Sequence, residues 1–138
     1  MNIDFKVYDT IIFIFSNDMS KVVLLEQASK LDGIFYRDKA KISPVEISKK
    51  IKNDFNLEIE PRKFRTVVTL QNIDKIQHVT IMMTLTDIEK IKRVEGDKIK
   101  ITSTNQIPDN CIPQLKWLIP MAIDVTIYGC EFNQVLTK

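Results

Sequence analysis

Glycine, histidine and cysteine are scarce in this chain of 138 residues, and each shortage excludes a kind of site. Three glycines leave little room for a glycine-built phosphate loop. His78 is the single histidine, so a histidine-based metal cluster is excluded, and a Cys/His or Ser/His triad would depend on that residue alone. Cys111 and Cys130 lack CxxC spacing, and we expect both to be reduced thiols.

Long apolar runs are missing too. The longest run, IIFIF at 11–15, is far too short to span a bilayer. Acidic residues stand near the N-terminus, where a secretory signal would carry lysines. The net charge of +2 comes without a basic tail or aromatic-basic interleaving, so nucleic-acid binding has no clear signature. We therefore expect a cytoplasmic protein that has no membrane partner.

The remaining composition is that of an ordinary globular protein, with 44% hydrophobic and 28% charged residues. A chain of this length buries most of its apolar surface without disulfides or metals. Residues 1–138 are therefore predicted to form a single domain.

The stretch at 43–57, SPVEISKKIKNDFNL, predicts an amphipathic helix with a defined start and end. The Ser43 hydroxyl is suited to accept from the free N–H groups of the first turn, and Pro44 suits the first helical position. Asn56 tolerates the left-handed conformation that commonly ends a helix. The apolar stripe recurs at every fourth residue, at Ile47, Ile51 and Phe55.

Apolar runs with β-type patterns predict strands on both sides of this helix. The predicted strands lie at 5–15, 21–25, 63–70, 78–86 and 97–102, and the segment 34–42 is predicted to be a strand followed by a loop that leads into the helix. The first two runs predict a hairpin. The runs at 63–70 and 78–86 predict another, around a turn at 72–75. In the last run, Ile99 and Ile101 are expected to point inward.

A second helix is predicted over 113–128, where Pro120 is expected to kink or split it. Its buried stripe is Leu115, Leu118, Ala122 and Val125. Trp117 is expected in the core. The segments 26–33 and 87–96 are expected to be polar loops, and the tail predicts no element. The order of strands and helices predicts the α+β class, with a mixed, mostly antiparallel sheet sandwiched between helices.

These elements resemble the Nudix hydrolases, whose signature is G-x5-E-x7-R-E-U-x-E-E-x-G-U with U a bulky aliphatic residue. A strand pair leads to LDGIF at 31–35, similar to the family's approach to its glycine-rich loop. KKIKNDFNL at 49–57 stands where the family has the second half of the signature. IPDNCIPQLKWLIPMAID at 107–124 is similar to the closing loop and C-terminal helix of small bacterial and phage members. The resemblance implies a Nudix-like α/β/α sandwich.

The signature can be aligned by placing its two aliphatic positions on Ile51 and Leu57. The family's arginine then falls on Lys49, and its first glutamate falls on Lys50. A lysine repels a cation and cannot bind one while it is protonated.

The two adjacent glutamates of the signature fall on Asn53 and Asp54. A slip of one residue is also open, in which Lys50 takes the arginine position and Asp54 the first of these glutamates. In the family the glutamates hold divalent metal ions that bridge the diphosphate of the substrate. Asp54 is the one carboxylate left, so no metal site is expected and Asp54 is the only candidate ligand.

The resemblance therefore implies a divergent member with a degenerate Nudix box. The leading hypothesis is a non-catalytic protein that binds a nucleotide or another phosphate-containing ligand without a cofactor, or that serves as a protein-interaction module. The expected ligand-binding residues are Phe35, Tyr36, Arg37, Lys49, Lys50, Asn53 and Met82. The alternative is a Mg²⁺-dependent hydrolase of a nucleoside diphosphate derivative with relocated metal ligands, in which Asp54 and Glu46 are the candidate catalytic residues. A third hypothesis is a protein that regulates a macromolecular partner and takes no small ligand.

Overall fold

A computed structural model of the chain describes residues 6–72, 76–91, 98–128 and 132–136. Strands and helices follow one another in the order β1 (Val7–Phe15), β2 (Lys21–Gln27), β3 (Lys30–Asp32), β4 (Ile34–Asp38), α1 (Pro44–Phe55), the 3-10 helix η1 (Pro61–Lys63), β5 (Arg65–Asn72), β6 (Gln77–Leu85), the 3-10 helix η2 (Ile88–Lys90), β7 (Lys98–Ser103), α2 (Leu115–Tyr128) and β8 (Phe132–Leu136).

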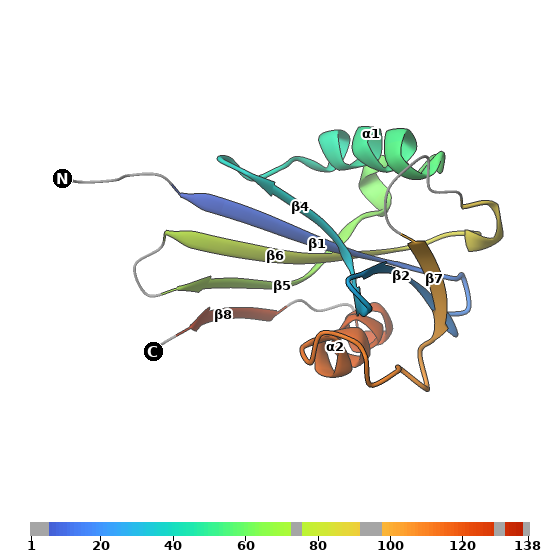
Figure 1. Ribbon diagram of the computed structural model, residues 1–138. Helices are drawn as coiled ribbons and strands as arrows, with labels where there is room; N and C mark the ends of the chain where they lie inside the picture. The colour runs from blue at the N-terminus through green and yellow to red at the C-terminus, as the bar shows by residue number, and fades with distance from the viewer. Residues whose placement is uncertain (1–5, 73–75, 92–97, 129–131, 137–138) are drawn as a thin grey trace.

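The strands form one mixed sheet with a helix on each face, so the predicted α+β sandwich is confirmed (Figure 1). The main strand order is β3-β2-β1-β6-β5-β8, while β4 pairs with β1 and β7 pairs with β2. The β1–β6 and β5–β8 pairs are parallel, and the other pairs are antiparallel. Both predicted hairpins, β1–β2 and β5–β6, are present.

The centre of the sheet is β1, whose side chains are buried on both faces. Ile12 and Ile14 pack into the core beneath α1, whereas Phe13 and Phe15 pack into the core beneath α2. These four side chains are fully buried. A strand that is covered on both faces reads as a continuous apolar run rather than an alternating one, which is why the segment IIFIF has no polar positions.

Helix α1 begins and ends as its sequence predicts. Ser43 is extended, and its Oγ accepts a hydrogen bond of 3.2 Å from the backbone N–H of Glu46. Asn56 has a φ of 54° in the left-handed region, and its backbone N–H bonds the carbonyl of Lys52. The stripe of Ile47, Ile51 and Phe55 is fully buried against the sheet.

Helix α2 runs through Pro120 without being split, and its buried stripe is the one predicted. The expectation that Trp117 lies in the core is wrong, because its side chain is 45% exposed. Two residues along a helix correspond to a rotation of about 200°, so burial of Leu115 turns Trp117 toward solvent. No helix in the described part of the chain is long and apolar enough to cross a membrane.

The polar segment at 26–33 is not a plain loop, because β3 folds back onto β2 as an antiparallel hairpin. The tight turn between them uses Ala28 and Ser29, both with positive φ. Such turns usually carry asparagine or glycine, so Ala-Ser gives no hairpin signal in the sequence.

The outer strands differ from expectation in two places. Ile101 lies on the same face of the sheet as its buried pairing partner Val23, but it is 46% exposed because β7 lies at the margin of the sheet, whereas Ile99 packs against the core beneath α1. The tail, for which the sequence predicted no element, contains β8, which pairs in parallel with β5.

The segment at 87–96 is only partly described, and there Ile88 is buried rather than in an exposed loop. Residues 92–97, most of the predicted turn at 72–75 and Cys130 lie outside the described residues.

Candidate ligand-binding cleft

A cleft of about 300 Å³ lies between the β2–β3–β4 side of the sheet and α1. We call it the cleft. It is lined by Leu25, Gln27, Asp32, Gly33, Ile34, Phe35, Tyr36 and Asp54. Its walls thus combine apolar residues with two carboxylates, an amide and a phenol, which is the kind of lining that binds small polar molecules.

Tyr36 connects the sheet to the charged face of α1. Its hydroxyl donates a hydrogen bond of 2.9 Å to Oδ2 of Asp54. The ammonium of Lys50 lies 5.3 Å from the centroid of the Tyr36 ring, within the range of a cation–π contact. The amide of Asn53 donates to the other oxygen of Asp54 over 3.4 Å. Both carboxylate oxygens of Asp54 therefore accept a hydrogen bond within the protein.

Asp32 is a second carboxylate in the cleft, and the sequence analysis did not single it out. Its Oδ1 accepts a hydrogen bond of 2.7 Å from the backbone N–H of Gly33, while burial raises the pKa of its carboxyl above the ordinary value. The only sequence signal was the pair Asp32-Gly33, which predicts a turn. Pairing of β3 with β2 brings Asp32 to the same cleft as Asp54.

Gly33 is required by the close approach of the chain to β1. A Cβ at this position would lie 2.8 Å from Cγ2 of Ile11 and 2.9 Å from Cε1 of Phe13. The absence of a side chain thus lets the wall of the cleft pack directly on the central strand.

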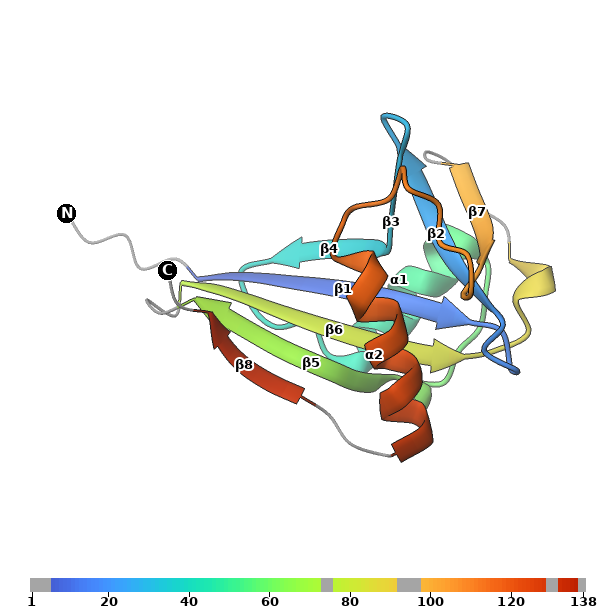
Figure 2. The same ribbon diagram turned by 90° about the horizontal axis from the view of Figure 1, so that it is seen from below.

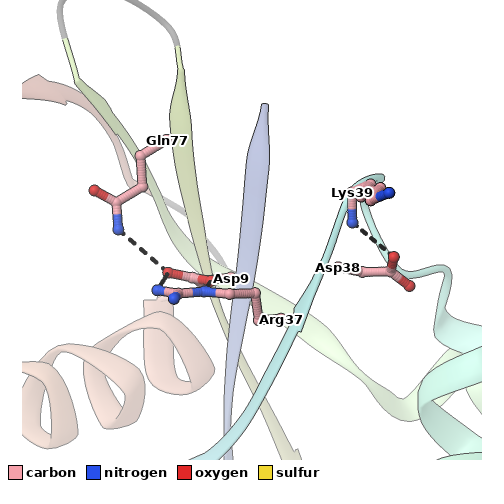
Figure 3. Close-up of polar contacts among 5 residues, drawn as sticks. All are labelled: Asp9, Arg37, Asp38, Lys39 and Gln77. Carbon is pink, nitrogen blue, oxygen red and sulfur yellow. Dashed lines mark hydrogen bonds and ion pairs between the residues drawn. The ribbon is translucent and has the colours of Figure 1, made fainter. Parts of the chain in front are cut away.

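Arg37 faces away from Tyr36, on the other side of the sheet. Its guanidinium holds Asp9 with two hydrogen bonds of 2.7 and 3.0 Å, and Gln77 donates a third over 3.2 Å (Figure 3). The hydrogen bonds from Arg37 are the main cause that lowers the pKa of Asp9. The ring of Phe35 lies 5.5 Å from the guanidinium carbon of Arg37, so Phe35 borders the cleft while its ring sits beside Arg37.

The other candidates lie apart from the cleft. Met82 is 5% exposed in the core beneath α1. Lys49 and Asn53 line a different hollow on the opposite flank of α1. Glu46 is exposed in the first turn, eight residues before Asp54 and hence about 12 Å away along the helix axis.

The cleft does not reproduce a three-glutamate metal site. Among the described residues, no group of three or more His, Cys, Asp or Glu side chains could hold a metal ion. Asp32 and Asp54 supply two carboxylates. The ammonium of Lys50 lies over the ring of Tyr36, whose hydroxyl donates to Asp54. This donor set does not fit a metal held by protein ligands alone.

Comparison with known proteins identifies the fold of the chain but not its activity. No protein-family model matches the chain, and no curated protein matches it in sequence. The crystal structure of a NUDIX hydrolase from Nitrosomonas europaea is similar over 99% of this chain and 82% of its own, with a TM-score of 0.69 and 10% identity. A MutT structure, from work on Aliivibrio salmonicida and Vibrio cholerae, is similar over 83% of this chain and 98% of its own, with a TM-score of 0.62 and 10% identity. The predicted Nudix-like fold is therefore confirmed.

Proposed function

We propose that this chain is a catalytically degenerate Nudix-fold protein that binds a nucleotide or another phosphate-containing small molecule in the cleft, without a metal. It is then a divergent relative of the small bacterial and phage Nudix proteins. The observation that carries the proposal is the position of Lys50, whose ammonium lies over the Tyr36 ring beside the cleft. The family signature has a metal-binding glutamate at this position under the alignment on Ile51 and Leu57.

Lys50 does not line the cleft itself, but it contacts Tyr36, which does, so its ammonium is placed to neutralise a ligand's charge at the margin of the cleft. In a metal-dependent site the divalent ion carries the charge that balances the diphosphate. An ammonium can bind a phosphate oxygen directly, as a point charge. Tyr36 and Gln27 add a phenol and an amide that can hydrogen-bond the rest of a ligand.

Thermal denaturation in EDTA, with ADP, GDP, ADP-ribose and inorganic pyrophosphate as separate probes, tests the proposal. At a concentration 100 times Kd a ligand stabilises by about 2.7 kcal/mol. For a chain of this length that raises Tm by roughly 9 °C. Lys50→Glu should abolish the shift, whereas Lys100→Glu, an exposed charge reversal on β7, should leave it unchanged.

The contrary result is equally definite. If none of the four probes raises Tm at millimolar concentration, the proposed binding function is wrong. A shift that survives in Lys50→Glu would place the ligand elsewhere on the protein.

A second function, that of a metal-dependent hydrolase of a nucleoside diphosphate derivative, is favoured by one observation. Asp32 lines the same cleft as Asp54, which doubles the carboxylates available there. Magnesium is commonly held by one or two carboxylates together with substrate phosphates. Release of the nucleoside monophosphate from nucleoside diphosphate derivatives, assayed with Mg²⁺ or Mn²⁺, distinguishes the two functions. Turnover that disappears in both Asp32→Asn and Asp54→Asn would replace the binding proposal by this one.

A further inference from the structure

Two hollows on the far side of α1 from the cleft share one lysine. The larger, which we call the groove, has a volume of about 580 Å³ between α1 and residues 58–63. The smaller, which we call the notch, has a volume of about 300 Å³ between η1, the ends of β5 and β6, and α2. Lys63 lines both, so the two hollows adjoin.

The charged residues around these hollows are mostly basic. The basic belt consists of Lys49, Lys52, Arg62, Lys63 and Arg65. The two acids lining the hollows are each paired with a member of the belt: Glu58 with Lys52 at 3.2 Å and Glu60 with Arg62 at 2.6 Å.

The pairing leaves three cations in excess. Lys49, Lys63 and Arg65 are exposed and form no ion pair within the described part of the chain. A surface with a local excess of one charge, over two adjoining hollows, attracts an extended partner of the opposite charge.

The notch adds an apolar element to this charged surface. Half-buried Leu85 forms part of its lining together with Thr84 and Thr126, and Met83, which is 1% exposed, forms its floor. The Thr126 hydroxyl donates to the sulfur of Met83 over 2.9 Å, which turns its polar atom toward the wall. Thr84 Oγ1 is buried, and no hydrogen-bond partner for it exists among the described residues. The notch thus suits an aliphatic side chain that is flanked by acidic groups.

The composition of the hollows distinguishes between two kinds of polyanion. Proteins that bind single-stranded nucleic acids combine a basic track with aromatic side chains on which bases stack. Neither hollow has an aromatic residue in its described lining. A protein segment needs no stacking platform, because its carboxylates meet the cations and its apolar side chains fill the notch.

We infer that the basic belt is a docking surface for an acidic protein segment that places an aliphatic side chain in the notch. Carboxylates of the segment pair with Lys49 and Lys63 along the groove and with Arg65 at the notch. The cleft lies on the other flank of α1, so this surface is spatially separate from the proposed small-molecule site.

The test is a titration of the full chain with a short synthetic peptide of glutamates that carries leucine at every fourth position. Binding is followed by fluorescence anisotropy of the labelled peptide at two salt concentrations. We expect binding that weakens as salt rises, because exposed charges are screened. Peptides with glutamine for glutamate, or alanine for leucine, should bind at least about tenfold more weakly, which is 1.4 kcal/mol.

Matched double variants locate the site. Lys63→Glu with Arg65→Glu should weaken binding at least about tenfold. Lys30→Glu with Lys100→Glu makes the same charge change on β3 and β7, outside both hollows, and should change Kd by less than about twofold. If thermal denaturation shows the first pair to be unfolded, Lys49→Glu with Lys63→Glu takes its place.

Methyl NMR provides an independent reading of the contact. We expect the methyl signals of Met83 and Thr126 to shift on peptide addition. Equal weakening in the belt and control variants would overturn the inference in favour of non-specific attraction. Tighter binding of an oligothymidylate of equal charge would overturn it in favour of nucleic acid, and no binding of the acidic peptide would remove it altogether.

Discussion

At the scale of single residues, the pair of Asp9 and Arg37 differs from the other ion pairs of the described chain because one of its members is buried. The carboxylate of Asp9 is 4% exposed and accepts three hydrogen bonds, whereas the Arg37 side chain is 60% exposed. The arginine therefore spans from solvent to a buried partner. A buried carboxylate that loses its partner keeps the full penalty of its desolvation.

Arg37→Ala should lower the free energy of unfolding by about 2 kcal/mol, because it leaves Asp9 with only the bond from Gln77. Urea denaturation at pH 7 measures this. Arg62→Ala is the matched control, since both members of its ion pair with Glu60 are exposed and solvent screens their attraction, so its effect should be much smaller. Equal effects of the two substitutions would contradict the distinction.

The same pair predicts a pH dependence. The pKa of Asp9 in the folded protein lies below the ordinary value of 3.8, so its stabilising effect is present above that value. The effect is lost as the pH falls through the lowered folded pKa. The stability difference between wild type and Arg37→Ala should therefore be constant near neutrality and shrink below pH 3.8. Urea midpoints across the acid range measure it, and a constant difference down to pH 2 would contradict it.

Gly33→Ala should destabilise the protein by about 1–3 kcal/mol, because the new Cβ would overlap Ile11 and Phe13. Thermal denaturation measures the loss. The double variant with Ile11→Ala should show a favourable coupling energy, since the second change removes the nearer of the two clashing atoms. Additive effects would show that the contact with Ile11 does not cause the loss.

At the scale of secondary-structure elements, α1 is held by its caps and its apolar stripe. Its opposite face carries polar and charged residues, which include the candidate ligand-binding residues Lys50 and Asn53. Ser43→Ala should lower stability by about 1 kcal/mol, because the hydroxyl accepts from the N–H of Glu46 in the first turn. Ser43→Asp keeps an acceptor there and should restore most of the loss. Chemical denaturation compares the three proteins, and equal losses in both variants would exclude capping as the cause.

The sequence predicted elements well where the signal is local. The limits of α1 follow from Ser43, Pro44 and Asn56, each of which acts within one turn of the helix. The elements it missed depend on partners far away. Strand β8 exists through its pairing with β5, and β3 closes onto β2 by a turn with no glycine or asparagine.

The residues of the candidate site also differ in whether the sequence or only the pairing of distant strands reveals them. Tyr36, Lys50 and Asp54 were named from the family resemblance, and the structure brings the three side chains together. Asp32 was missed because only the pairing of β3 brings it to the cleft. Successive side chains of a strand point to opposite faces of the sheet. Arg37 therefore lies on the other face from Tyr36, although the two are neighbours in the sequence and were predicted to share a site.

At the scale of the whole molecule, one sheet separates two cores, one beneath α1 and one beneath α2 (Figures 1 and 2). β1 belongs to both, and it pairs along its whole length with β6. Removing β1 from its neighbours would open both cores at once. The stabilities of the two cores therefore both depend on this strand.

Hydrogen exchange should show this arrangement. The amides of β1 and β6 should exchange only by global unfolding, because both strands lie inside the sheet. The amides of β7, which pairs with β2 alone, should exchange faster by local opening. Native-state exchange at increasing urea separates the two classes, and a shared opening energy for β1 and β7 would contradict the prediction.

Helix α1 also separates two spaces, and one hydrogen bond crosses between them. Asn53 lines the groove and donates to Asp54, which lines the cleft. A molecule in the groove that recruits the Asn53 amide would leave one oxygen of Asp54 available to accept a hydrogen bond from a molecule in the cleft. By thermodynamic reciprocity, a molecule in the cleft that engages that oxygen would release the amide toward the groove by the same coupling energy. The two spaces are thus connected through one pair of neighbouring side chains on a shared helix.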